Sequence, residues 1–250
     1  MAEEHSFPTE VIDLPSKGKL YPKDSPLSDG KLELKYMTAK EEDILTSQNL
    51  IKKGIVLDKL MDSLIVTKGV KSDDLVLGDK NAVMVAARIL AYGPEYTAEI
   101  KNPNTGELTQ YTFDLSKCPF KEITDGIDKN EFKVTLPVSK TEVSYRILTG
   151  KDERLITAEL EKLKKLKTEV TPELTTRLRY MMTSVDGDSD TSVITKFSKE
   201  MLARDSMFLR QIIKSTSPDI DLRQEIDMEG ETVTVDIPMT VSFFWPSTEA

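Results

Sequence analysis

Residues 96–148 read YTAEIKNPNTGELTQYTFDLSKCPFKEITDGIDKNEFKVTLPVSKTEVSYRIL, the one long stretch of the chain with the alternation typical of β-strands. Apolar side chains occupy every second position on both sides of two polar turns, at residues 102–106 and 137–141. The alternating residues are Tyr96, Ala98, Ile100, Tyr111, Phe113 and Leu115 around the first turn, and Phe132, Val134, Leu136, Val143, Tyr145 and Ile147 around the second. The pattern predicts two antiparallel hairpins. Because an isolated hairpin is marginal in water, we expect the flanking segments to cover them.

The flanking segments have apolar residues at helical spacing. We expect helices over residues 38–52, 56–65, 79–92, 149–167, 172–182 and 197–214. Two of these helices begin with a capping box, Thr38 with Glu41 and Thr149 with Asp152. Pro218 ends the last helix, and the final segment predicts strands again, first at Val233, Val235 and Ile237 and then at Val241 and Phe243.

The expected fold class is therefore α+β, with central antiparallel β-hairpins and helical segments before and after them. A chain of 250 residues fits one or two compact domains. The predicted segments are an extended N-terminal arm and strand (1–37), a helical segment (38–95), the hairpin block (96–148), a second helical segment (149–216) and a C-terminal β segment (217–250).

The composition indicates which kinds of molecule the protein binds. The chain has a net charge of −9, one cysteine and no run of eighteen apolar residues, and its acidic first residues do not resemble a signal peptide. The charge disfavours broad binding to nucleic acid, and the single cysteine fits a reducing cytoplasm. We expect protein partners, with no nucleic acid and no membrane.

Residues with catalytic or metal-binding potential do not form a site in the sequence. His5 is the only histidine, Cys118 has no histidine to activate it, and lysines 162, 164, 165 and 167 alternate with glutamates as on a solvated helix face. Asp186 to Asp190 imitates the start of a calcium loop, but Thr191 and Phe197 replace the glycine and glutamate that the loop needs. We expect no catalytic residues, no cofactor and no metal, and therefore no enzyme.

Two extended apolar segments, Val11–Tyr21 and Val241–Pro246, are the candidate contact surfaces. Prolines keep both out of helices and leave backbone groups available for strand addition to a neighbour. The candidate partner contacts are Leu14, Leu20, Tyr21, Phe244 and Trp245. The alternative is that both segments fold back over the protein itself.

Four motifs, taken together and in this order, resemble the baseplate hub protein family of T4-type contractile-tailed bacteriophages. They are LPSKGKLY (14–21), MTAKEEDIL (37–45), YRILTGKDE (145–153) and FFWP (243–246), and the resemblance spans residues 11–246. It implies a component of the hub or central spike complex in the tail baseplate of the virion, assembled in the host cytoplasm with other hub and spike proteins.

The resemblance also has a consequence for metal binding, and it is compatible with two different roles for the protein. Members of the family often carry a Cys-Pro-x-Cys-Gly turn where this chain has Asn102-Pro103-Asn104-Thr105-Gly106, so the two thiols are replaced by poor zinc ligands. The first role is a structural subunit of the finished baseplate. The second is a transient, chaperone-like assembly factor that is absent from the mature virion.

Overall fold

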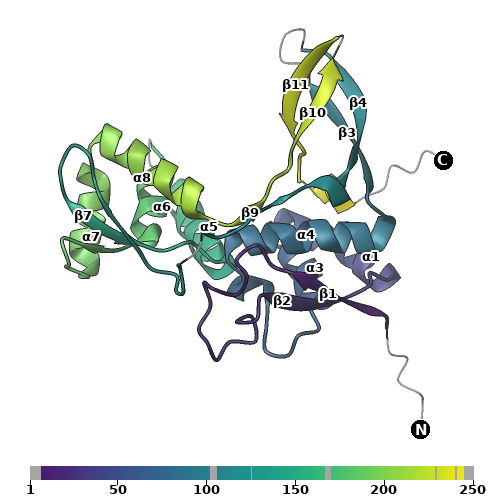
Figure 1. Cartoon of the computed structure of the whole chain (residues 1–250), viewed down its shortest axis with the longest axis horizontal. Coiled ribbons are helices and arrows are strands. Elements are labelled where there is room, and N and C mark those ends of the chain that lie inside the picture. Colours follow the sequence, from purple (N-terminus) through teal and green to yellow (C-terminus); the bar gives the residue numbers. More distant parts are fainter. Residues whose placement is uncertain are drawn as a thin grey trace.

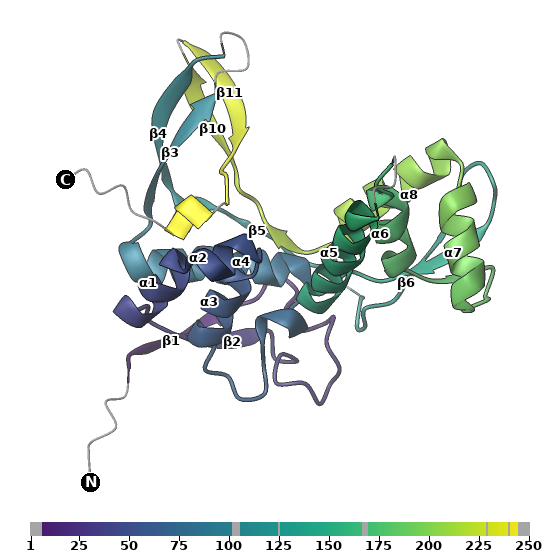
Figure 2. The ribbon, with the colours of Figure 1, turned by 180° about the vertical axis from the view of Figure 1, so that it is seen from behind.

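The computed structural model describes residues 7–101, 106–124, 126–166, 170–228, 230–239 and 241–244. Within them the chain is α+β, as predicted, with small antiparallel sheets and eight α-helices (Figures 1 and 2). The helices are α1 (Ala39–Thr46), α2 (Gln48–Lys52), α3 (Val56–Leu64), α4 (Leu77–Tyr92), α5 (Gly150–Lys165), α6 (Glu173–Met181), α7 (Thr191–Glu200) and α8 (Ala203–Thr216). The strands are β1 (Thr9–Asp13), β2 (Lys31–Lys35), β3 (Glu95–Lys101), β4 (Leu108–Asp114), β5 (Phe120–Lys121), β6 (Phe132–Thr135), β7 (Glu142–Tyr145), β8 (Met182–Val185), β9 (Asp219–Ile220), β10 (Arg223–Met228) and β11 (Glu231–Asp236).

The elements form three parts (Figure 1). The N-terminal body contains β1, β2 and α1–α4, and the second body contains β6–β8 and α5–α8. The β-arm consists of the hairpins β3–β4 and β10–β11, which project together from the N-terminal body. Short 3₁₀ helices, η1 (Ser72–Asp74), η2 (Leu115–Lys117) and η3 (Val241–Phe244), connect or end these parts.

The first predicted hairpin forms one half of the β-arm. β3 pairs antiparallel with β4, and Tyr96 lies opposite Phe113. Every second residue of β3 is buried, beginning with Tyr96, and the intervening ones are exposed. The buried face packs with partly buried apolar residues of β10–β11, such as Ile226 and Val233. Each hairpin therefore covers the apolar face of the other, as an isolated hairpin could not.

The second predicted hairpin lies in the second body and not beside the first. β6 pairs with β7, and β8 continues this sheet on the far side of β7. Val143 and Tyr145 pack with Leu178 of α6 and Leu209 of α8 in a core of their own. Both hairpins are thus confirmed, but the later helices cover only the second one.

Two predicted helices differ from the structure. The helix predicted over 38–52 is interrupted at Ser47, whose extended backbone separates α1 from α2. The helix predicted over 197–214 begins earlier, at Thr191, and is divided into α7 and α8 by the extended residues 201–202. In both cases the apolar spacing continues across the break, so periodicity alone could not reveal it.

The predicted strand after residue 240 is wrong. Residues 241–244 form η3, and the adjacent rings of Phe243 and Phe244 are both buried. Successive side chains of a strand point to opposite faces, so a strand could not bury two consecutive rings in one core. β10 was not predicted, because its exposed positions hold charged residues and only Ile226 and Met228 supply apolar character.

Candidate functional site

Helix α4 lies at the centre of the N-terminal body and carries two buried charged residues. Asp79, in its first turn, is 0% exposed, and Arg88, four residues before its end, is 4% exposed. A buried charge is tolerated only where hydrogen bonds replace its water. Asp79 binds the N-terminal segment, and Arg88 binds Phe243 near the other end of the described chain together with residues just after its own helix. We call the two groups the Asp79 clamp and the Arg88 clamp.

The Asp79 clamp holds the N-terminal segment. Ser16 donates to the Asp79 carboxylate through its backbone N–H (2.9 Å) and its hydroxyl (2.6 Å), and the Tyr21 hydroxyl donates to it at 2.6 Å. The Tyr21 oxygen also accepts from the backbone N–H of Val76 at 3.0 Å. Gly18, between the two donors, has φ +76°, and a β-carbon there would lie 2.3 Å from a backbone oxygen of Ser28. The loop 14–21 therefore needs its serine, its glycine and its tyrosine for distinct physical reasons.

Burial determines the protonation of this clamp. It raises the pKa of Asp79, although the hydrogen bonds from Ser16 and Tyr21 act in the opposite direction. Burial, together with the neighbouring Asp79 charge, also raises the pKa of Tyr21 well above its usual value. Tyr21 accordingly stays a hydrogen-bond donor at neutral pH, as the geometry requires.

The Arg88 clamp holds the C-terminal segment. The guanidinium donates to three backbone carbonyls, those of Phe243 (2.9 Å), Gly93 (3.1 Å) and Glu95 (3.1 Å). It also lies over the ring of Tyr96, 5.8 Å from its centre. The Tyr96 ring meets Phe243 edge to face at 4.9 Å. The clamp therefore joins α4, the base of the β-arm and η3 at one point.

A third buried charge, Glu41 of α1, closes the capping box predicted from the sequence. Its carboxylate accepts hydrogen bonds from the backbone N–H and the hydroxyl of Thr38, from the Ser63 hydroxyl and from the Lys35 ammonium. Burial alone would raise the pKa of Glu41, but the hydrogen bonds from Lys35, Thr38 and Ser63 lower it to about 2. The group connects β2, α1 and α3.

The two bodies meet at a close backbone contact. Gly150, the first residue of α5, donates to the carbonyl of Leu75 at 2.9 Å, and Leu77 donates to that of Leu148 at 3.1 Å. A β-carbon on Gly150 would lie 2.5 Å from the Ser72 carbonyl oxygen. A β-carbon on Gly78 would lie only 1.8 Å from that of Pro218. Glycine is required at both positions because another backbone occupies the space of a side chain.

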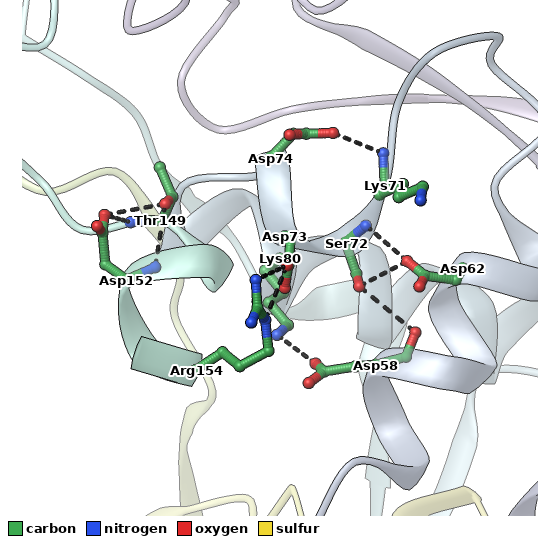
Figure 3. A network of polar contacts seen from close by, with 10 residues as sticks. All are labelled: Asp58, Asp62, Lys71, Ser72, Asp73, Asp74, Lys80, Thr149, Asp152 and Arg154. Carbon is green, nitrogen blue, oxygen red and sulfur yellow. Dashed lines mark hydrogen bonds and ion pairs between the residues drawn. The ribbon is translucent and has the colours of Figure 1, made fainter. Parts of the chain in front are cut away.

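Polar contacts surround this junction (Figure 3). The predicted capping box at the start of α5 is confirmed, since Thr149 donates to Asp152 through its N–H and its hydroxyl, both at 2.9 Å. Arg146 binds the same carboxylate with two hydrogen bonds of 2.7 Å. Arg154 of α5 reaches across to Asp73 of η1 at 2.7 Å. Of these contacts, the Arg154–Asp73 pair crosses from α5 to the N-terminal body, while the others hold the start of α5 in place.

A groove of about 750 Å³ lies beside the junction, between α4, the end of α8 and β9. Apolar side chains line much of it, and they are Leu77, Ile147, Leu148, Met181, Ile213, Ile220, Leu222 and Ile237. Several polar side chains in its lining pair with one another. Asn81 donates a hydrogen bond to Asp219 (3.0 Å), and Arg223 forms an ion pair with Asp221 (2.6 Å). The surface of the groove that a ligand could contact is therefore mainly apolar.

The structure places four of the five candidate partner contacts inside the protein. Leu14, Leu20, Tyr21 and Phe244 are all buried in the core of the N-terminal body. The fifth candidate, Trp245, lies outside the described residues. The segments 14–21 and 243–244 therefore fold back onto their own chain, which is the alternative that the sequence left open, and these four side chains are unavailable to a partner in this structure.

The candidate ion ligands of the sequence have structural roles. Asp186 accepts from the backbone N–H of Glu142 at 2.8 Å, and Asp190 caps α7 through Ser192 at 2.6 Å. Cys118 is buried, which raises the pKa of its thiol. No group of three or more His, Cys, Asp or Glu residues suited to a metal occurs in the described part of the chain. The turn with Asn102 and Thr105 lies outside that part.

Comparison with protein-family models, with curated proteins and with solved structures finds no match to this chain. Among the described helices, none is both long enough and apolar enough to cross a membrane.

Sequence reasoning missed Asp79 and Arg88. A signal for Asp79 was present, since it precedes Val83 by four residues and Ala86 by seven and so lies on the apolar stripe of its helix. A carboxylate on such a stripe predicts a buried hydrogen-bonded group. Arg88 gave no comparable signal, because its three acceptors are backbone carbonyls that no residue type identifies.

Proposed function

We propose that this protein is a non-enzymatic component of a contractile phage tail baseplate and acts in the hub or central spike complex during tail assembly. The observation that carries the proposal is the occurrence, in order, of the four motifs that resemble the T4-type hub family. The proposed partners are other hub and central spike proteins, and the proposed location is the baseplate of the virion.

The positions of the motifs support this proposal. The motif 14–21 supplies Ser16 and Tyr21 to the Asp79 clamp, and the motif 37–45 supplies Thr38 and Glu41 to the buried group of α1. The motif 145–153 supplies the capping box and the close glycine contact at the junction of the two bodies. The described half of the motif 243–246 supplies Phe243 to the Arg88 clamp. Motifs whose residues hold distant segments together suit a protein that acts as a rigid scaffold.

The buried charges support the absence of catalysis. Each buried charged residue in the described part of the chain forms hydrogen bonds to other residues of the same chain. These residues are Glu41, Asp79, Arg88, Asp152 and Asp205. Catalytic groups more often lie in a cleft with a shifted pKa and an accessible atom. The shifted groups here, such as Asp79 and Glu41, lie under other elements and use their oxygens for structural hydrogen bonds.

The test combines affinity capture with an inventory of the virion. The tagged full chain, expressed during phage infection, is expected to capture baseplate hub or spike proteins while tails assemble, and a tagged early protein of the same phage serves as the control. A fixed copy number in purified virions indicates the structural subunit. Capture of hub proteins without presence in virions indicates the transient assembly factor. If neither capture nor presence in virions is found, the proposal is wrong.

A further inference from the structure

Strand β1 has one paired edge and one free edge. Its neighbour is β2, and no other strand pairs with it within the described residues. Thr9, Glu10, Val11 and Asp13 are all exposed, and the apolar side chain of Val11 is 56% exposed. Figure 1 shows β1 beside β2 at the outer surface of the N-terminal body.

The direction of each backbone group follows from the register. Tyr36 donates to the carbonyl of Pro8, and Leu14 donates to that of Gly30, which makes the even-numbered residues of β1 the hydrogen-bonded partners of β2. Because antiparallel pairs alternate, the N–H and C=O groups of Thr9, Val11 and Asp13 point away from β2. Proteins commonly protect such edges with short strands, charged side chains, proline or a bulge. β1 has no proline, lysine or bulge and stays in unbroken register with β2, and its protection is limited to its length of five residues and its two acidic side chains, Glu10 and Asp13.

We propose that β1 pairs with β1 of a second copy of this chain, antiparallel about a two-fold axis at Val11, and so joins two β1–β2 hairpins into one four-stranded sheet. This inference does not depend on the proposed function. The two Val11 residues would lie opposite each other, and Thr9 of each copy would lie opposite Asp13 of the other. Each of these pairs has its backbone groups directed outward and can exchange two hydrogen bonds.

The side chains favour a second copy as the occupant of the edge. In the register centred on Val11, a hydroxyl faces a carboxylate at Thr9 and Asp13, and Glu10 faces the apolar Ile12. No two like charges lie directly opposite. Registers centred on Glu10 or on Asp13 would instead oppose two carboxylates, which destabilises a strand pair. The symmetric pairing also removes the exposed Val11 side chains from water, one against the other.

The contact is small, so the test must detect weak association. Two short strands bury less than the roughly 800 Å² per partner of a standard interface. Val11→Cys is expected to form a disulfide-linked dimer under mild oxidation, because the opposed Cα atoms would be about 5.5 Å apart, within disulfide range. Thr9→Cys is the matched control, since the two substituted positions would be about 13 Å apart along the strands.

The expected result is a rate of dimer formation about tenfold or more higher for Val11→Cys than for Thr9→Cys or for wild type with its buried Cys118. Equal rates would indicate random collision, and no dimer from the pure chain would indicate a different occupant or none. Either result overturns the proposal.

A charge exchange gives an independent readout. Val11→Lys and Val11→Glu each place like charges across the proposed axis and are expected to weaken self-association, whereas an equimolar mixture restores it. Analytical ultracentrifugation of the three samples measures this. Thermal unfolding checks that each variant is folded, as the exposure of Val11 leads us to expect. If both variants self-associate as wild type does, residue 11 is not at the axis and the proposal is wrong.

Discussion

In the first turn of α4, Asp79 accepts three hydrogen bonds from the N-terminal segment, whereas nine residues later Arg88 donates three, one of them to the C-terminal segment. The acid lies near the positive end of the helix dipole and the base lies nearer its negative end. The Asp79 clamp depends on named side chains, Ser16 and Tyr21. The Arg88 clamp depends on backbone carbonyls, and it therefore constrains the path of the chain more than the identity of its residues.

The largest effect is expected at the Arg88 clamp. Arg88→Ala leaves three carbonyls without their donor and a space beneath η3, so we expect a loss of about 3–5 kcal/mol in the free energy of unfolding. For a chain of this size the melting temperature should fall by about 10 °C. Arg154→Ala is the control, because its ion pair with Asp73 is half exposed and should contribute no more than about 1 kcal/mol. Similar losses for the two variants in urea unfolding would contradict this account.

A smaller loss is expected at the other end of the helix. Asp79→Ala removes the shared acceptor of the Ser16 and Tyr21 donors, and we expect a loss of about 2–4 kcal/mol. The loss is smaller because the Tyr21 hydroxyl keeps its bond to the Val76 N–H. If Asp79→Ala destabilises more than Arg88→Ala in urea unfolding, the ranking of the two clamps is reversed.

Acid should distinguish Asp79 from Glu41. The folded pKa of Glu41 is about 2, below its ordinary value of 4.5, so its contribution is present above pH 4.5 and is lost as the pH falls towards 2. We expect this group to remove about 2–3 kcal/mol over that range, and Glu41→Gln to flatten the decline. The folded pKa of Asp79 is raised, so its contribution decreases as the pH rises through that value. Asp79→Asn should therefore steepen the acid decline, and urea unfolding at a series of pH values tests both signs. Equal slopes for both variants would contradict the assignment.

The smallest effect concerns a single hydroxyl. Tyr21→Phe removes the donor to Asp79 and the acceptor of the Val76 N–H, with an expected loss of about 1–2 kcal/mol. Tyr180→Phe is the control, since its hydroxyl is 3.3 Å from the partly exposed Glu159. In a double-mutant cycle with Asp79→Ala the two losses should not add, because the residues share one hydrogen bond. Additive losses would show that the clamp does not act as a unit.

Much of the fold could be predicted where local chemistry and tertiary structure agree. The hairpins at Tyr96 and Val143 follow from alternation, and the starts of α1 and α5 follow from their capping boxes. The assignment of the two hairpins to different parts of the molecule could not be predicted. Alternation indicates which face is apolar, but it does not indicate which segment covers that face.

The clamps were harder to predict than the elements they connect. The segment 14–21 was recognised as apolar and extended, yet its burial depends on an acceptor 58 residues away from Tyr21 in the sequence. The same holds for Phe243, whose partner Arg88 is 155 residues away. Extended segments that bind another protein and extended segments that fold back onto their own core have similar local composition. The two cases can therefore be distinguished only by knowing which residues contact the segment.

The separation between Arg88 and Phe243 also has a consequence for synthesis. At about 5–20 residues per second, the ribosome needs roughly 8–30 s after adding Arg88 to reach the 155th residue beyond it. During that time the Asp79 clamp can already form, because all its members precede Arg88, while the guanidinium Nε that donates to Phe243 and the site that receives η3 remain open. A nascent chain of this protein can therefore have a closed N-terminal loop while the side of the Tyr96 ring that later contacts Phe243 is still uncovered.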